Sequence, residues 1–478
     1  MHTAAPFRIA ASSPEEMNKH FSLVTTAFVL LIFYGGALQY LSLAIDQAQS
    51  NVIILTQSDL SDLSDSGPLK YSKDIVIITL ILSFVNMVFS GRKIKGLEIY
   101  IGVTLVQILF MAIGLVGVIE SPDVRLFVVA GVRWNLVFNG SIALLCMCYT
   151  QQLDELTESL IGKGLFILSS VNSLFLLYQT KVADLYALVA GQGAVRLPGL
   201  FSHAGVAGTF AIGIALVCIS IRSVSLTVRV GIYANAMFAA LTAGSRQAII
   251  VVISVIFLEL YNRIKGADNS SKRIIAPILF VGAAVLAIPT IYVFVNDAAG
   301  RGDIFETQAE EGGRLSNFAG AINDLFSGDI INVFFGGGLG KATNNAMALL
   351  FQAGVPPSAY TLNYITDDTT ITLVFQYGLI GAACFLALFI WSMIVLAPTA
   401  AGSARRLHWL FIFIILLMCF ACNIFEQYFF ITALAASIGL NSRTQNLAPE
   451  SRIVPLEGSG GRRRLGSGGS RLAGRARV

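Results

Sequence analysis

The chain has 478 residues, of which 55% are hydrophobic and only 13% charged, and its mean hydropathy is +0.74. A soluble domain with so little polar surface does not stay in solution, so the composition excludes a soluble protein. The formal net charge of +4 is small and gives no reason to expect a nucleic-acid partner. Apolar residues gather in runs of the roughly 20 residues that a helix needs to cross a bilayer. The sequence predicts an all-α polytopic membrane protein.

About twelve hydrophobic segments have the character of membrane spans. They cover residues 22–45, 74–90, 97–119, 126–149, 160–178, 203–221, 224–243, 245–262, 273–295, 372–397, 408–423 and 426–440. The predicted organisation is an N-terminus at 1–21, a block of about nine helices at 22–295, a large loop at 296–371, a block of about three helices at 372–440 and a tail at 441–478. Glu15, Glu16 and His20 precede the first run, so we expect a retained first span rather than a cleavable signal peptide.

Lysine and arginine in short loops predict the orientation of these spans. In the twelve-span interpretation the basic residues of four loops lie on one side together with both termini: Arg92, Lys93, Lys95, Arg222, Arg229, Arg263, Lys265, Lys272, Arg273, Arg405 and Arg406. The opposite loops carry Asp46, Asp59, Asp62 and Asp65. Both termini are therefore predicted to be cytoplasmic, and the large loop is predicted to be external.

The tail at 441–478 is rich in Arg, Gly and Ser and has almost nothing to bury, so we expect disorder there. Part of it resembles an engineered linker, although its arginines could also touch anionic lipid headgroups. We assign it no function.

Cysteine and histidine are poorly placed for a metal site. All six cysteines lie inside apolar runs, and none of the four histidines lies in the large loop. Neither disulfides nor a zinc site is expected, and no metal or other cofactor is predicted. His203 begins the sixth span externally and could line a cavity, but capping the helix entrance is the more ordinary role.

The loop at 296–371 is too long for a passive connection. Apolar residues at helical spacing after Gly313 predict one helix, and residues 344–352 predict a second. Between them, Phe335 to Gly340 is rich in glycine. Ala342 follows Lys341 where a phosphate-binding loop has Ser or Thr, so the segment is interpreted as a flexible turn within a folded lid.

Four arginines are predicted at or near the external face: Arg133, Arg196, Arg246 and Arg314. Arginine close to a bilayer needs a partner or a water-filled cavity. A pair with Asp, Glu or a lipid phosphate is as good an explanation as function for any one of them. The occurrence of Arg196, Arg246 and Arg314 on one face favours function, because guanidinium groups suit bidentate contact with a diphosphate.

Asp367 and Asp368 end the loop just before the tenth span. Adjacent acids are often merely solvated, yet this pair is predicted at a membrane boundary that faces the arginines. An ionised aspartate there could take a proton from an attacking hydroxyl. The pair is the candidate for acid/base chemistry.

Three stretches resemble the O-antigen polymerase and O-antigen ligase superfamily of bacterial envelope glycosyltransferases. Residues 196–203 are similar to its Arg-x-x-Gly-x-Phe segment, and residues 241–246 to its Ser-Arg element. The third stretch runs from Gly313-Arg314 through the glycine-rich 335–340 to Asp367 and the Gly-Leu-Ile-Gly of 378–381. The ligase branch carries a histidine and an asparagine shortly before the last element, where this chain has Asp367-Asp368, and this difference favours a polymerase.

The resemblance implies a GT-C-like enzyme of the bacterial inner membrane with a periplasmic catalytic loop. Its donor and acceptor are undecaprenyl-diphosphate-linked glycans, as in O-antigen, lipopolysaccharide or exopolysaccharide synthesis, with a chain-length regulator as a further protein partner. Arg196, Arg246 and Arg314 would neutralise the leaving lipid diphosphate, with Arg133 and His203 as further substrate-binding candidates. Asp367 would be the base and Asp368 would orient it, without a metal.

Three alternatives stay open. A ligase that transfers glycan to a lipid A core or to a protein shares the same plan, as does a cell-wall transglycosylase, which no motif favours. A transporter or flippase of lipid-linked glycans also uses buried arginines and a similar number of spans. The sequence shows no internal repeat, and nine spans, a loop and three spans make an asymmetric arrangement that argues against the transporter.

Overall fold

A computed structural model describes residues 14–50, 71–119, 123–151, 153–190, 197–201, 204–265, 330–340, 368–398 and 402–442, together with 319, 320, 322, 323, 326, 343 and 354. All regular elements in these ranges are helices. The described residues do not include the tail beyond Ser442. They also leave out most of the predicted loop 296–371, and with it most of the two helices expected there.

The helices follow the predicted spans. They are α1 (Pro14–Ser50), α3 (Ser72–Phe89), α4 (Leu97–Val116), α5 (Val124–Thr150), α6 (Glu155–Ala190), α7 (Ala204–Ser220), α8 (Leu226–Thr242), α9 (Arg246–Lys265), α13 (Ile330–Phe335), α15 (Thr369–Val395), α16 (Ser403–Ala421) and α17 (Tyr428–Ser442). Each predicted span has its helix except 273–295, which lies outside the described residues. The short helix α13 was not predicted.

By length and composition, 7 of the described helices are able to cross a membrane: α1, α3, α4, α5, α6, α9 and α15. Helices α7, α8 and α17 are also apolar but shorter. A long apolar helix satisfies its own backbone hydrogen bonds, which is what spanning a bilayer requires. The chain is therefore a helical, multi-pass membrane protein, while the number of about twelve spans stays a prediction.

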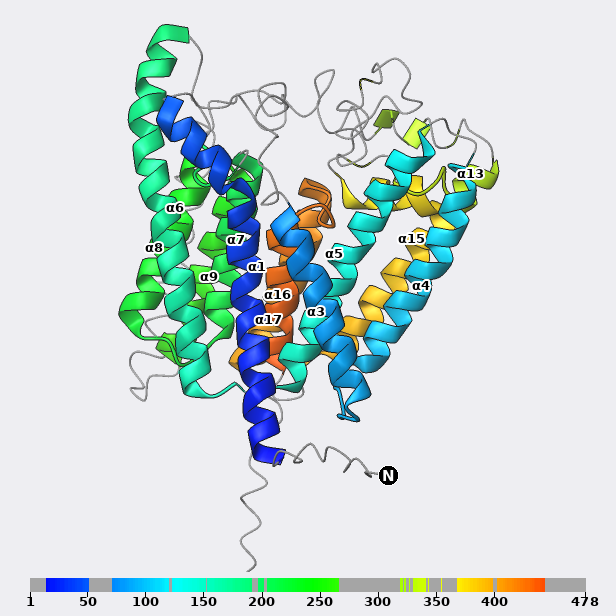
Figure 1. The fold of residues 1–478 in the computed structure, drawn as a ribbon, viewed down its shortest axis with the longest axis horizontal. Helices are drawn as coiled ribbons and strands as arrows, with labels where there is room; N and C mark the ends of the chain where they lie inside the picture. The colour runs from blue at the N-terminus through cyan, green and yellow to red at the C-terminus, as the bar shows by residue number, and fades with distance from the viewer. Residues whose placement is uncertain are drawn as a thin grey trace, which may run out of the picture. The chain divides into compact units, whose positions relative to one another are not determined.

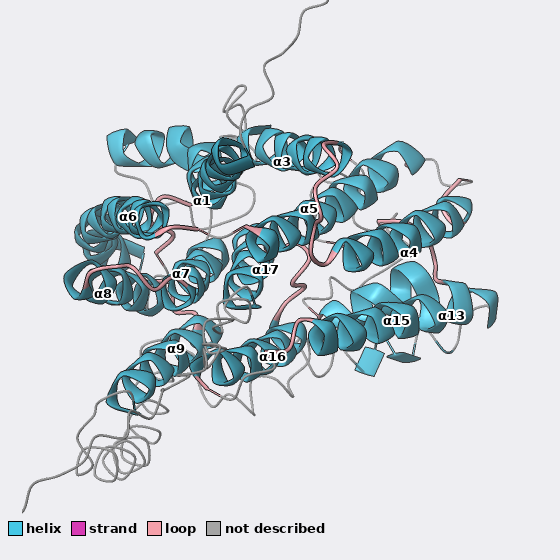
Figure 2. Cartoon of the chain, turned by 90° about the horizontal axis from the view of Figure 1, so that it is seen from below, coloured by secondary structure: helices cyan, strands magenta, loops and turns pink. Residues whose placement is uncertain are grey.

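Helix α17 lies at the centre of the bundle (Figure 2). It packs against α5, α7, α1 and α16, and all of its residues are buried. A helix that is apolar on all sides has no face to present to water, so it is placed in the interior. The break between α16 and α17, at residues 422–427, therefore lies next to the central helix of the bundle.

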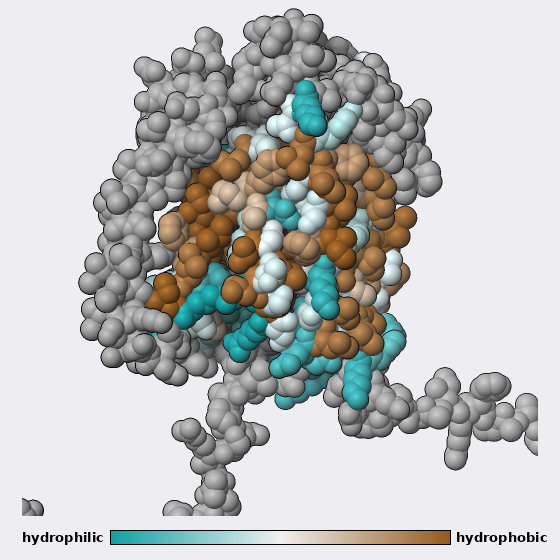
Figure 3. All heavy atoms as spheres, turned by 90° about the vertical axis from the view of Figure 1, so that its left-hand side faces the viewer, coloured by the Kyte–Doolittle hydropathy of each residue, from teal (hydrophilic) through white to brown (hydrophobic). Residues whose placement is uncertain are grey.

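The outer helices expose apolar side chains. Leu82 of α3, Leu105 of α4 and Leu174 of α6 are 63%, 62% and 65% exposed. On the side that carries α6 and α8, hydrophobic side chains form a wide band with hydrophilic ones along its lower edge (Figure 3). A surface of this kind matches lipid tails rather than water.

The basic loops gather at one end of the bundle, the lower end in Figure 1. There the guanidinium of Arg92 lies 4.3 Å from the ring of Phe21 near the start of the first span. Arg406 at the start of α16 donates to Asn262 at the end of α9, over 2.9 and 2.6 Å. The sequence predicts that these loops lie on one side, and their described basic residues lie at one end of the bundle. Which side of the membrane that end faces stays a prediction.

At the same end, two buried charges fix the turn between α7 and α8. Arg229 donates to the carbonyl oxygens of Cys218 and Ile221, over 2.9 and 2.6 Å, at the C-terminus of α7. Glu158 of α6 accepts from the backbone N–H of Arg222, over 2.7 Å, and also from the next N–H. A cation at the carbonyl end of a helix and a carboxylate on free N–H groups both satisfy backbone that has no helical partner.

Asp154 caps the N-terminus of α6, where its Oδ1 accepts from the backbone N–H and the hydroxyl of Thr157 over 2.8 and 2.6 Å. These hydrogen bonds lower the pKa of Asp154, because they stabilise the carboxylate. We expect Asp154→Ala to cost about 1 kcal/mol of stability, the usual value of a cap. Asp154→Asn keeps the cap.

The pH dependence of stability separates Asp154→Asn from the natural protein. A lowered folded-state pKa means that the stabilisation is present above the unfolded-state pKa of about 3.9 and is lost as pH falls through the folded value. Thermal unfolding of the detergent-solubilised protein between neutral and acid pH is the measurement. In Asp154→Asn the part of the acid-induced loss of stability that comes from protonation of Asp154 should disappear. An identical acid profile in the two proteins would contradict a capping carboxylate.

Candidate functional site

The predicted site residues divide into two groups. Arg196, His203, Arg314 and Asp367 lie outside the described residues. The remaining three, Arg133, Arg246 and Asp368, all lie toward the end of the bundle opposite the basic loops, where α3, α5, α9 and α15 end or begin.

Arg133 of α5 forms an ion pair with Asp74 of α3. Its Nε and Nη2 donate to the two carboxylate oxygens over 3.2 and 2.9 Å. Both side chains are partly exposed, at 32% and 25%. This bidentate pair satisfies the guanidinium within the protein. The structure therefore agrees with the simpler explanation for Arg133, which is an ion pair with an acidic residue.

Asp368 is the N-cap of α15. Its side chain accepts from the backbone N–H of Ile371 over 2.9 Å, and its carbonyl oxygen accepts from the N–H of Thr372 over 3.1 Å. Aspartate is one of the residues that helices prefer at this position. The described role of Asp368 is thus structural. Any part in orienting Asp367 stays a prediction.

Two segments of the predicted site lie against each other: residues 196–203, of which 197–201 are described, lead into α7, and residues 241–246 lie between α8 and α9. The backbone N–H of Leu197 donates to the carbonyl oxygen of Thr242 over 2.9 Å. Gly199 has a positive φ of 64° and exchanges two hydrogen bonds with the amide of Gln179, over 2.8 and 2.9 Å. The residue after Arg196 is therefore bonded to the turn that leads into Arg246.

The glycine-rich segment 335–340 is not a flexible turn. It is inserted between α4, α5 and α15, where Leu339 is buried and its N–H donates to the carbonyl oxygen of Gly114 over 2.9 Å. The N–H of Gly337 donates to the carbonyl oxygen of Phe375 over 2.7 Å, and that of Gly340 to Oε1 of Gln376 over 3.2 Å. The prediction of a flexible turn was wrong, because these backbone groups find hydrogen-bond partners on two helices, α4 and α15.

A kink in α15 receives this segment. Gly378 has φ 68° and ψ −176° inside the helix, so the helix is interrupted there. A Cβ at Gly378 would lie 2.2 Å from the carbonyl carbon of Phe334, and one at Gly336 would lie 2.3 Å from the carbonyl oxygen of Gln376. Only glycine allows two backbones to approach this closely at positive φ. Two separate glycine elements of the sequence are thus one packed unit.

The break between α16 and α17 brings polar groups into the same region. Thr369, directly after Asp368, donates to the carbonyl oxygen of Cys422 over 2.8 Å and accepts from the N–H of Ile424 over 3.0 Å. Asn423 is 1% exposed, and neither polar atom of its side chain has a hydrogen-bond partner among the described residues. Buried amides without partners are uncommon and mark a place where water or a ligand completes the site.

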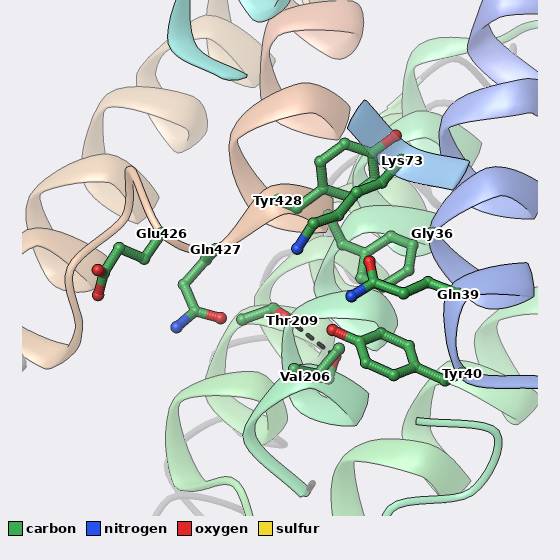
Figure 4. Close-up of a pocket in the computed structure, with 10 residues that line it drawn as sticks. Gly36, Gln39, Tyr40, Lys73, Val206, Thr209, Glu426, Gln427 and Tyr428 are labelled. Atoms are coloured by element: carbon green, nitrogen blue, oxygen red, sulfur yellow. Dashed lines mark hydrogen bonds between the residues drawn. The ribbon is translucent and has the colours of Figure 1, made fainter. Parts of the chain in front are cut away.

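A small pocket opens beside this break (Figure 4). It is formed by α1, α3, α7, the break itself and the start of α17, and its polar side chains are those of Gln39, Tyr40, Lys73, Thr209, Glu426, Gln427 and Tyr428. Its volume is about 30 Å³, which is room for one or two water-sized groups.

The sequence did not single out Lys73 or Gln39, and it treated Asn423 and Glu426 only as an interruption between spans. The available signal was a lysine at the start of a span and two polar residues inside an apolar stretch. Each is uncommon within a membrane and indicates an internal partner or a site. Within the described ranges no group of three or more His, Cys, Asp or Glu side chains could hold a metal ion.

Comparisons with protein-family models, with curated proteins and with solved structures found no match to this chain.

Proposed function

We propose that this protein is a polymerase of undecaprenyl-diphosphate-linked oligosaccharide repeat units. It joins the glycan of one lipid-linked donor to a hydroxyl of a second lipid-linked unit, as in the synthesis of O-antigen or exopolysaccharide. In this proposal it lies in a bacterial inner membrane with about twelve spans and a GT-C-like plan. Its termini are cytoplasmic, and the reaction takes place at the periplasmic face.

One observation carries the proposal. The sequence segments that resemble the polymerase and ligase superfamily are far apart in the chain, yet they make direct backbone contacts in two pairs. Leu197 is bonded to Thr242, and Gly337 is bonded to Phe375 next to the kink at Gly378. The pairing supports a shared site at the end of the bundle opposite the basic loops.

The proposed chemistry is a displacement that needs no metal. The carboxylate of Asp367 takes the proton of the acceptor hydroxyl, whose oxygen forms the new bond to the anomeric carbon of the donor. The bond from that carbon to the lipid diphosphate breaks, and the diphosphate leaves with the electron pair. Arg196, Arg246 and Arg314 stabilise the negative charge that develops on it.

The test uses purified protein in detergent with lipid-linked repeat units and no nucleotide. A ladder of longer glycans on a gel is the expected product. Unchanged substrate would overturn the polymerase proposal. In a parallel reaction that also contains lipid A core, transfer of the glycan to that acceptor alone would identify a ligase instead.

Variants of the two aspartates separate chemistry from structure. We expect Asp367→Ala and Arg314→Ala each to abolish the ladder without lowering protein abundance, whereas Asp368→Asn should elongate at nearly the normal rate. Asparagine caps a helix as well as aspartate does, so α15 keeps its N-terminus. Initial rates of ladder formation at equal protein concentration are the measurement. Near-normal elongation in Asp367→Ala removes it as the base.

A further inference from the structure

Lys73 is an unusual feature of the first turn of α3. It is half-buried at the end of the bundle away from the basic loops, in the pocket beside the α16–α17 break. Among the described residues its amine takes part in no hydrogen bond and no ion pair. An ammonium group at the edge of the apolar layer is costly without a counter-ion. The structure therefore has a cation that lacks a direct anionic partner within the described residues.

The carboxylates nearby do not fill this role. Asp74, the next residue, gives both of its oxygens to Arg133. Glu426 lines the pocket, but its carboxylate extends away from the amine of Lys73 (Figure 4). Of the two charged groups that line the pocket, the ammonium of Lys73 therefore points into it and the carboxylate of Glu426 points away (Figure 4).

The groups around the amine are able to donate hydrogen bonds to a ligand. The amide of Gln39 and the hydroxyl of Tyr40 point toward the amine of Lys73 (Figure 4). The amide can rotate to present its NH₂ group. The hydroxyl of Thr209 donates to the carbonyl oxygen of Val206 over 3.0 Å and leaves its oxygen free to accept from a protonated oxygen. One inward cation with neutral donors beside it, and the carboxylate of Glu426 turned away, is a composition that suits a phosphate oxygen.

The size of the pocket limits what enters it. About 30 Å³ holds one or two water-sized groups, so the oxygen atoms of a phosphate group fit and a sugar ring does not. The pocket also adjoins the segment 196–203. Two rings that line the pocket lie close to the ring of Phe201 in that segment: Tyr40 at 6.1 Å and Phe429 at 5.3 Å between ring centroids.

We propose that the pocket around Lys73 binds a phosphate group carried by a membrane lipid. The diphosphate of the lipid-linked glycan and the headgroup of an anionic phospholipid share this chemistry. Naming the diphosphate as the ligand rests on the proposed function, while the binding of phosphate does not.

The test measures binding to the purified protein in a neutral detergent. Undecaprenyl diphosphate, phosphatidylglycerol and inorganic pyrophosphate are titrated separately, and Kd is taken from the change in tryptophan fluorescence or thermal stability. We expect Lys73→Gln to weaken lipid binding roughly tenfold or more, as loss of one charge-assisted hydrogen bond implies. Lys73→Arg should bind nearly as well as the natural protein.

Controls make the result specific. Lys163→Gln removes an exposed lysine of α6 outside the pocket and should leave every Kd unchanged. Stronger, Lys73-dependent binding of undecaprenyl diphosphate identifies the diphosphate as the ligand, and equal Lys73-dependent binding of phosphatidylglycerol identifies a headgroup site.

Equal Kd values for the natural protein and Lys73→Gln with all three probes overturn the proposal. If Lys73→Gln is not monodisperse on size exclusion, Gln39→Leu takes its place, and an unchanged Kd in that variant overturns the proposal too. Failure of the glycan ladder with Lys73-dependent binding intact counts against the polymerase alone. A normal ladder without such binding counts against the pocket alone.

Discussion

Replacing Gly378 with alanine is expected to destabilise the protein severely. The new Cβ would lie 2.2 Å from both the carbonyl carbon and the carbonyl oxygen of Phe334, at a φ of 68°. Backbone cannot move aside as a flexible side chain does. Overpacking of about 1–3 kcal/mol and positive-φ strain of about 1–2 kcal/mol add together, so we expect a loss of roughly 3 kcal/mol or more. Gly336→Ala, 2.3 Å from the carbonyl oxygen of Gln376, should behave similarly.

Two glycines serve as matched controls for this prediction. Gly91 has φ 74° with nothing within 4 Å of the added Cβ, so Gly91→Ala reports the strain alone. Gly102 lies in α4 with ordinary contacts of 3.6 and 3.7 Å, so Gly102→Ala tests the loss of a glycine in a helix without either penalty. The unfolding temperature in detergent is the measurement. Equal temperatures for Gly378→Ala and Gly91→Ala would show that the packed glycine unit is not what constrains this end.

Arg229→Met is expected to produce the second large loss, at the opposite end of the bundle. Arg229 is 4% exposed, donates to carbonyl oxygens of α7 and lies 3.5 Å from Oε1 of Glu259. Removing one member of a buried charge pair costs about 3–5 kcal/mol, because the other charge and the carbonyl groups lose their partner. Arg229→Lys should recover only part of this, since a single ammonium cannot reproduce the guanidinium fork.

Arg263→Met is the control for the arginine prediction. Arg263 donates to the same Oε1 of Glu259 over 2.7 Å, but its side chain is 44% exposed and the pair is four residues apart on α9. Such exposed pairs contribute about 0.3–0.5 kcal/mol. A clear difference in unfolding temperature between the two variants is expected. If both lower it equally, the burial of Arg229 is not what makes it important.

The class of the protein follows from the sequence by itself. Runs of apolar residues of bilayer length need no tertiary information to be recognised, since each helix satisfies its own backbone and must hide its side chains from water. The positions of the described helices other than α13, including the separation of α8 from α9 and of α16 from α17, follow from the same patterns. The grouping of the basic loops at one end could also be predicted, because charge in short loops alternates with the direction of the chain.

The tertiary structure alone decided how the polar and glycine residues are used. Arg133 is held by Asp74, and the glycine-rich segment is packed into the kink at Gly378. None of these partners is near in sequence, and a sequence pattern reports only local periodicity. The sequence did not identify Lys73 as a site residue, because the pocket around it is formed by α1, α7 and the break before α17. A partner for a buried charge is a property of packing between distant segments, so only the folded chain determines it.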